Sequence, residues 1–173
     1  TRKDFDLVNR QEVKDYFEDR YFDIVIHTCA EGGRRDVKDD DTVFLNNLKM
    51  YLNLAEQAPQ YRYLFTFTSG ADYDKSSPIN GDMNNLQTSY PSDPYGLSKN
   101  IIARLMRQHI NFYNFRIYGV FGKNEAEGRF ITTSIKNLKN KKPIEIHQDR
   151  YFDFVYIDDL VNLIEYYTNT IES

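Results

Sequence analysis

The sequence has few residues that could cross-link the chain or bind a metal ion. It contains one cysteine, Cys29, which excludes an internal disulfide and any cysteine-rich metal site. A single cysteine suits a reducing compartment, so we expect a cytoplasmic protein without a metal site. No apolar run approaches the length of a membrane span, and no signal peptide is visible. We therefore expect no membrane partner.

The sequence also has fewer positively than negatively charged residues. Lys and Arg number 22 against 26 Asp and Glu, which gives a net charge of −4. Nucleic-acid binders usually carry a concentrated basic face, whereas the densest charge run here is the acidic "DVKDDD", Asp36 to Asp41. We interpret that run as a solvated loop or helix entry and expect no nucleic-acid partner. The 40% of hydrophobic residues suffices for one globular domain with a sizeable core.

Apolar patterns alternate between strand and helix along the chain. Phe22 to Ala30 and Tyr61 to Gly70 are short β-branched or aromatic runs typical of buried parallel strands. Between them, the spacing of apolar residues predicts an amphipathic helix over Val43 to Ala58. A second helix is predicted from Tyr95 to Ile110, and a third strand with its exit loop over Ile110 to Gly122. This order predicts an α/β fold with a mostly parallel sheet, in which ligands bind beyond the carboxyl ends of the strands.

Three polar residues near those strand ends suggest proton-transfer chemistry. Tyr95 and Lys99 are four residues apart at a predicted helix start, so their side chains share one face of the helix. A neighbouring ammonium favours tyrosinate, and we therefore expect Lys99 to lower the pKa of Tyr95. Ser69, at the end of the preceding strand, could share a substrate oxygen with Tyr95. The three residues would suit proton transfer at a carbonyl or carbinol.

Four motifs together resemble the extended short-chain dehydrogenase/reductase family. They are "TSGADY" after the second strand, "PYGLSK" at Pro94 to Lys99, "NNL" in the first long helix and "FVYIDDL" near the end. Members of this family are NAD(P)-dependent epimerases, dehydratases and reductases of nucleotide-activated sugars. The resemblance runs from about Phe5 to the last helix. It implies a Rossmann-like fold, NAD or NADP as cofactor, a nucleotide-diphosphate sugar as substrate, and Ser69, Tyr95 and Lys99 as the catalytic residues.

The same resemblance implies the binding residues. "DFDL" resembles the segment whose Asp contacts adenine, and "IHTCAEGG" resembles the His-x-Ala-Ala stretch along the pyrophosphate and ribose. The implied cofactor contacts are therefore Asp6, Cys29, Ala30, Asn47, Tyr95 and Lys99. "RFITTSIKNLKNKKPIEI" resembles a helix and strand that contact the nucleotide of the sugar. The implied substrate contacts are Ser69, Lys123, Asn124, Arg129 and Arg150.

The sequence departs from the family pattern in several places. All eight glycines lie from Gly32 onward, so the glycine-rich phosphate loop that should follow a first strand is missing. We expect that the sequence is an excerpt that omits this half, leaving a partial dinucleotide-binding domain at residues 1–122 and a substrate-side segment at 123–173. Gly119 stands for the family's Asn and Phe152 for its Arg, which affects substrate identity more than reaction type.

Two functions remain open on these residues. The first is an NAD(P)-dependent epimerase or reductase of a nucleotide sugar, favoured by the Ser, Tyr and Lys set. The alternative is a non-catalytic Rossmann-like module that binds a nucleotide or a protein, favoured by the missing glycine loop. We interpret His27 as a hydrogen-bonded core histidine, and Asp158 and Asp159 as the acidic start of the last helix. The family resemblance also suggests a homodimer through the two long helices.

Overall fold

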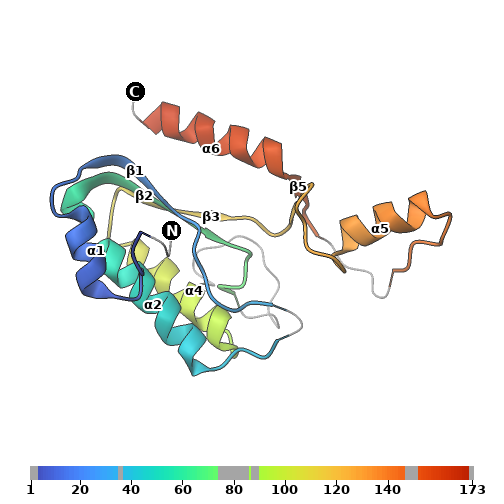
Figure 1. Ribbon diagram of the computed structural model, residues 1–173, viewed down its shortest axis with the longest axis horizontal. Coiled ribbons are helices and arrows are strands. Elements are labelled where there is room, and N and C mark those ends of the chain that lie inside the picture. The colour runs from blue at the N-terminus through green and yellow to red at the C-terminus, as the bar shows by residue number, and fades with distance from the viewer. Residues whose placement is uncertain (1–3, 35–36, 74–85, 87–89, 147–151, 172–173) are drawn as a thin grey trace. The chain divides into compact units, whose positions relative to one another are not determined.

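The computed structural model describes residues 4–34, 37–73, 86, 90–146 and 152–171 (Figure 1). The chain forms two compact units, residues 1–116 and 117–173. The first unit contains the three-stranded sheet and its helices, and the second contains a two-stranded sheet and two helices. Each unit is described by itself below.

The sheet of the first unit is entirely parallel. Its strands are β1 (Phe22–His27), β2 (Tyr61–Thr68) and β3 (Phe112–Arg116), and they lie in the order β1-β2-β3. His27 pairs with Thr66, and Thr68 pairs with Arg116, so the carboxyl ends of the three strands meet at one edge. The predicted parallel α/β arrangement is therefore confirmed, and it brings the segments after β1 and β2 to the same side of the molecule.

The helices of this unit lie on one side of the sheet (Figure 1). They are α1 (Arg10–Phe17), α2 (Asp41–Ala55) and α4 (Pro94–Met106), and a short 3-10 turn (Ala58–Gln60) follows α2. Each α-helix begins after a residue whose side chain accepts backbone N–H groups of the first turn, namely Asn9, Asp40 and Asp93. The caps of α2 and α4 place these two helix starts within two residues of the predicted positions, whereas α1 was not predicted.

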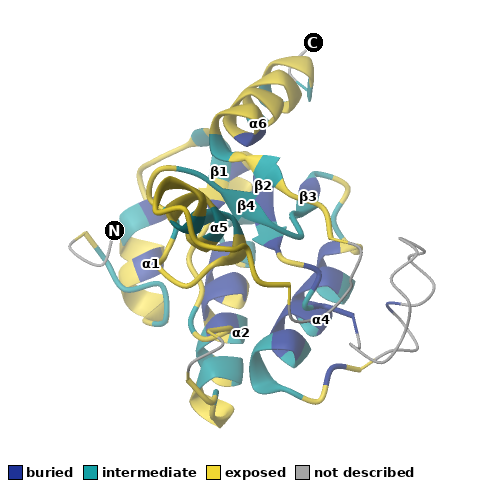
Figure 2. Ribbon diagram, turned by 90° about the vertical axis from the view of Figure 1, so that its right-hand side faces the viewer, coloured by how far each residue is buried: buried dark blue, intermediate teal, exposed yellow. Residues whose placement is uncertain are grey.

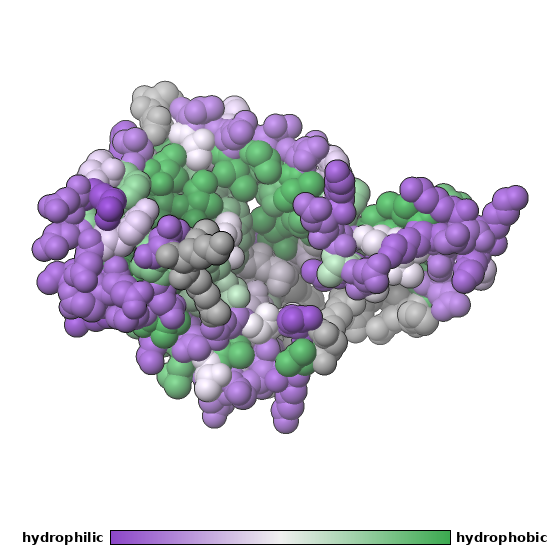
Figure 3. All heavy atoms as spheres, viewed as in Figure 1, coloured by the Kyte–Doolittle hydropathy of each residue, from purple (hydrophilic) through white to green (hydrophobic). Residues whose placement is uncertain are grey.

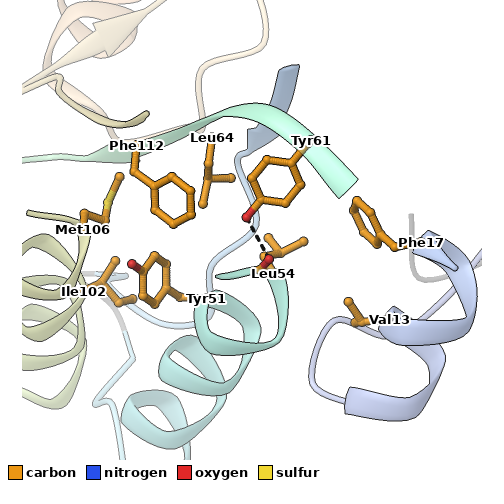
Figure 4. Packing of buried hydrophobic residues seen from close by; sticks show 9 residues of the cluster. All are labelled: Val13, Phe17, Tyr51, Leu54, Tyr61, Leu64, Ile102, Met106 and Phe112. Atoms are coloured by element: carbon orange, nitrogen blue, oxygen red, sulfur yellow. Dashed lines mark hydrogen bonds between the residues drawn. The ribbon is translucent and has the colours of Figure 1, made fainter. Parts of the chain in front are cut away.

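The core of the first unit lies between the sheet and the helices. Figure 2 shows buried residues on the helix faces that turn toward the strands, and Figure 4 shows the central cluster. Tyr61 packs there edge-on against Phe17, and its hydroxyl donates to the Leu54 carbonyl at 2.8 Å. The members of the cluster are Val13, Phe17, Tyr51, Leu54, Tyr61, Leu64, Ile102, Met106 and Phe112. Burial of this apolar surface stabilises the packing of α2 and α4 against the sheet, and it thereby positions the polar ends of these helices.

The second unit contains β4 (Val120–Phe121), α5 (Phe130–Lys139), β5 (Val155–Tyr156) and α6 (Ile157–Ile171). β4 and β5 pair in parallel. The strand expected over residues 110–122 is thus divided between β3 of the first unit and β4 of the second. The strand expected after α5 does not form over residues 143–146, which have no regular structure. Asp158 and Asp159 lie in the first turn of α6, as predicted.

The surface is mostly polar where the helices of the first unit face outward. Figure 3 shows hydrophilic side chains covering most of that side of the molecule, as expected for a chain with 28% charged residues. Within the described ranges, no helix is both long and apolar enough to cross a bilayer.

Candidate active site

The start of α4 carries the tyrosine and lysine that the sequence singled out. Asp93 caps this helix by accepting the Gly96 N–H at 2.8 Å, and Pro94 occupies the first helical turn. Tyr95 and Lys99 then lie one turn apart, with the Lys99 Nζ 5.6 Å from the centre of the Tyr95 ring. The Lys99 side chain is buried, so its ammonium is held within the unit.

Close packing brings α4 against the turn that follows β2. A Cβ atom at Gly96 would lie 2.7 Å from the Ala71 carbonyl oxygen, so only glycine permits this approach. Ser69 directly follows β2, and its side chain lies close enough to Tyr95 to lower the pKa of that tyrosine. Lys99 donates to the Phe67 carbonyl at 3.4 Å. The structure thus brings Ser69, Tyr95 and Lys99 together at the carboxyl end of β2.

The electrostatics of Tyr95 differ from the sequence-based expectation. Burial raises the pKa of Tyr95, the hydrogen bond from Ser69 lowers it, and the carboxylates of Asp39, Asp72 and Asp93 raise it further. The expectation of a lowered pKa is therefore wrong, because the pKa of Tyr95 is raised in spite of the neighbouring Lys99. Removal of the phenolate from water and three nearby carboxylates outweigh one ammonium, which donates to a backbone carbonyl.

Lys99 is subject to a similar competition. Burial lowers the pKa of Lys99, while the charges of Asp72 and Cys29 raise it. Desolvation disfavours the ammonium, and nearby negative charge restores it. The charge state of Lys99 therefore depends on residues outside α4, and Asp72 is the first of them.

His27 ends β1 beside this group. Its side chain is buried, and Nδ1 has no hydrogen-bond partner among the residues that the structure describes. Burial and the charge of Lys99 lower the pKa of His27 to about 4, so the ring is neutral at pH 7. The predicted core position is correct, but the hydrogen bond that we expected for it is not found at Nδ1.

Asn47 connects the loop after β1 to α4. Its Oδ1 accepts the Glu31 N–H at 2.8 Å, and its Nδ2 donates to the Glu31 carbonyl at 3.0 Å and to the Ser98 hydroxyl at 3.2 Å. Ser98 in turn donates to the Tyr95 carbonyl at 2.7 Å. Both amide hydrogens are used, and the side chain is 2% exposed. These bonds place Asn47 where it supports the loop and the Tyr95 backbone, and its contact with a cofactor stays a prediction.

The loop after β1 also packs on the Tyr95 ring. Gly33 has a φ of +72°, and a Cβ atom there would lie 2.9 Å from the ring. Its N–H donates to the Asp39 carboxylate at 3.0 Å, which holds that negative charge near Tyr95. Sequence reasoning did not assign a role to Gly33, Gly96 or Asp39. The neighbouring glycines Gly32 and Gly33 are visible in the sequence, but the contact of Gly33 with the Tyr95 ring depends on the fold.

The remaining predicted contacts lie in different places. Asp6 accepts the Val8 N–H at 3.0 Å and so forms a local turn, while Cys29 and Ala30 are exposed just after β1. Arg129 directly precedes α5, and Arg150 lies outside the described residues. Of the predicted substrate residues of the second unit that the structure describes, all three are exposed: Lys123, Asn124 and Arg129.

Several solved structures share this fold. A GDP-L-fucose synthetase from Naegleria fowleri bound to NADP aligns over 94% of this chain and 60% of its own, with 18% identity and a TM-score of 0.68. A GDP-mannoheptose C4 reductase from Campylobacter jejuni with NADP bound aligns over 96% and 62%, with 20% identity and a TM-score of 0.77. The ADP-L-glycero-D-manno-heptose-6-epimerase of Helicobacter pylori aligns over 90% of this chain and 52% of its own, with 21% identity and a TM-score of 0.71.

These similarities establish a Rossmann-like α/β fold, and the chain spans about three fifths of the length of the first of these structures. No curated protein sequence matches the chain significantly. The model of the NAD dependent epimerase/dehydratase family matches residues 1–173. The chain therefore belongs to the NAD-dependent epimerase/dehydratase family.

Proposed function

We propose that this chain carries the acid–base residues of an NAD(P)-dependent epimerase or reductase that acts on a nucleotide-diphosphate sugar. The observation that carries the proposal is the meeting of Ser69, Tyr95 and Lys99 at the carboxyl ends of the parallel strands. Ligands of open α/β sheets bind at such ends. Family membership and the GDP- and ADP-sugar enzymes among the similar structures support the same substrate class.

The residues present fit a nicotinamide dinucleotide. Lys99 gives one N–H to Phe67, and an ammonium has three to donate, which suits the hydroxyls of a ribose. Tyr95 lies beside it, and Cys29 and Ala30 present an exposed segment after β1. NAD or NADP supplies the hydride chemistry when bound. Lys123, Asn124, Arg129 and Arg150 are our candidates for the nucleotide of the sugar.

Proton transfer falls to Tyr95 in this proposal. Its hydroxyl gives a proton to a sugar carbonyl oxygen, or takes one from a sugar hydroxyl in the reverse direction. Ser69 shares that oxygen and orients it, because it follows β2 and its side chain acts on the pKa of Tyr95. Lys99 provides positive charge that favours the tyrosinate formed during the transfer. The raised pKa of Tyr95 keeps the side chain protonated at neutral pH, ready to act as the acid.

The test is turnover of the complete polypeptide with NAD or NADP and a panel of UDP-, GDP-, ADP- and dTDP-sugars. Tyr95→Phe should lower turnover by about 10²–10⁴-fold while cofactor affinity and folding are kept, since only one hydroxyl is removed. Tyr90→Phe is the matched control, because Tyr90 is an exposed tyrosine whose hydroxyl bonds Arg104. Unchanged turnover in Tyr95→Phe would refute the catalytic assignment. Cofactor binding without turnover of any sugar would favour a binding module instead.

A further inference from the structure

An ion pair with a buried carboxylate and a partly buried guanidinium lies behind the candidate active site. Asp72 is fully buried, and its Oδ2 accepts a hydrogen bond from the Arg116 Nε at 2.8 Å. Arg116 is the last residue of β3, and its guanidinium also lies over the Tyr73 ring, 4.9 Å from the centre. A buried carboxylate is costly unless it is paired and hydrogen-bonded. Its retention at this position therefore needs an explanation.

The contacts of Asp72 join three elements of the site. The Thr68 hydroxyl donates to Asp72 Oδ1 at 3.3 Å, and the Asn100 amide on α4 donates to the Asp72 carbonyl at 2.7 Å. Arg116 adds the end of β3. Ser69 lies inside the turn between Thr68 and Asp72, which is closed further by the Tyr73 N–H donating to the Gly70 carbonyl at 3.3 Å. The Asp72 carboxylate thus ties the turn that carries Ser69 to the end of β3, and the Asp72 backbone carbonyl ties the same turn to α4.

The same carboxylate acts electrostatically on both residues of α4. Lys99 precedes Asn100, and its ammonium donates to Phe67, next to Thr68. The groups whose charges act on Lys99 are Asp72 after β2 and Cys29 after β1, and Lys99 in turn acts on His27 at the end of β1. Asp72 raises the pKa of Lys99 against the effect of burial, and it also raises the pKa of Tyr95. The contacts of Asp72 and its charge therefore both indicate that this residue supports the site.

We propose that the Asp72–Arg116 pair is a positioning element of the candidate active site, which holds the Ser69 turn against the end of β3 and places the Asp72 carboxylate where it stabilises the Lys99 ammonium. Asp72 acts through Ser69 and Lys99 and touches no reacting atom. This proposal rests on the proposed function, because positioning matters only if the site is catalytic. The effect of Asp72 on the pKa of Lys99 can nevertheless be measured without cofactor or substrate.

The experiment titrates Lys99 by NMR in the full chain with isotope-labelled lysine, the signal being assigned by its loss in Lys99→Met. Asp72→Asn keeps the shape of the side chain and removes its charge, so the pKa of Lys99 should fall. Asp72→Asn with Arg116→Gln removes both charges and leaves no unpaired ion in the core, and the pKa should again fall. Glu56→Gln is the control, since it breaks the exposed Arg10–Glu56 pair of the same unit, in which the charged atoms are 2.6 Å apart.

A fall in the Lys99 pKa in both Asp72 variants, with no change in Glu56→Gln, would support the proposal. An unchanged Lys99 titration in the folded variants would overturn it, and so would failure of both variants to fold, because the pair would then serve stability alone. The proposed function is tested separately by turnover. A shifted Lys99 titration together with an inactive wild-type protein would refute the function and leave the role of Asp72 intact.

Discussion

The Lys99 Nζ lies 5.6 Å from the centre of the Tyr95 ring and donates to the Phe67 carbonyl at 3.4 Å. The ammonium thus faces the aromatic ring on α4 and the backbone of β2 at the same time. This relationship joins the helix to the strand that leads into Ser69. It also explains why removal of Lys99 should have wider effects than removal of the Tyr95 hydroxyl.

Lys99→Met should lower both turnover and cofactor affinity, whereas Tyr95→Phe should lower turnover alone. The ammonium serves the ribose and the tyrosine together in the proposed mechanism. Its loss disfavours tyrosinate, so the pH optimum of the remaining activity should move upward. Turnover against pH and NAD(P) dissociation constants provide the measurement, with Lys49→Met on the exposed side of α2 as control. An unaltered dissociation constant in Lys99→Met would contradict the ribose contact.

Gly96→Ala should destabilise the protein although alanine is the better helix former by about 1 kcal/mol. The added Cβ atom would lie 2.7 Å from the Ala71 carbonyl oxygen, a backbone atom that cannot rotate away. Overpacking of this kind costs about 1–3 kcal/mol. Urea unfolding at neutral pH measures the difference. A variant more stable than the wild type would show that α4 and the Ser69 turn are not in close contact.

Asn47→Ala should lower the free energy of unfolding by about 1–3 kcal/mol, because it leaves the Glu31 N–H and carbonyl without their side-chain partner. The neighbouring Asn46→Ala is the control. Asn46 makes one bond, at 2.9 Å, to the Glu31 carboxylate and leaves the Glu31 backbone untouched. Denaturant unfolding of both variants makes the comparison, and equal losses would contradict the special role of Asn47.

The burial of His27 predicts an acid-dependent loss of stability. Its pKa is lowered from 6.5 to about 4 in the folded chain. Between these values the unfolded state takes up a proton that the folded state does not, so stability falls as the pH falls through this range. The loss from this residue should be about 2 kcal/mol between pH 7.5 and pH 5.

His27→Gln should remove this part of the pH dependence, which urea unfolding at the two pH values can detect. His109→Gln is the matched control and should retain the loss, because His27 is still present in it. An identical pH dependence in the wild type and His27→Gln would mean that the ring is not buried in its neutral form.

A second copy of the chain should pair through α2 and α4. Leu45 and Leu52 lie seven residues apart on α2, on one face of the helix, and are 48% and 42% exposed. Leu45→Lys combined with Leu52→Lys should convert a dimer into a monomer in sedimentation velocity. Leu138→Lys on α5, where the leucine is more exposed still, should leave the dimer intact. A wild-type protein that sediments as a monomer would contradict the expectation.

The sequence by itself determined the three strands and the two longer helices of the first unit, though not α1, and the pairing of Tyr95 with Lys99. Their signals are local: apolar periodicity marks the elements, and Asp93 with Pro94 marks the helix start that sets both residues on one face. The tertiary structure alone decided the charge environment. Burial by the core and the approach of Asp39 and Asp72 from other segments reversed the expected direction of the Tyr95 pKa.

The contacts that hold the site together were also beyond the sequence. Asn47 meets Glu31 across 16 positions of the chain and Ser98 across 51, and Asp72 meets Arg116 across 44. Separations of this size leave no periodic signal, because they depend on how strands and helices pack. The division of residues 110–122 between β3 and β4 has the same origin, since strand pairing is settled by which partner each segment finds in space.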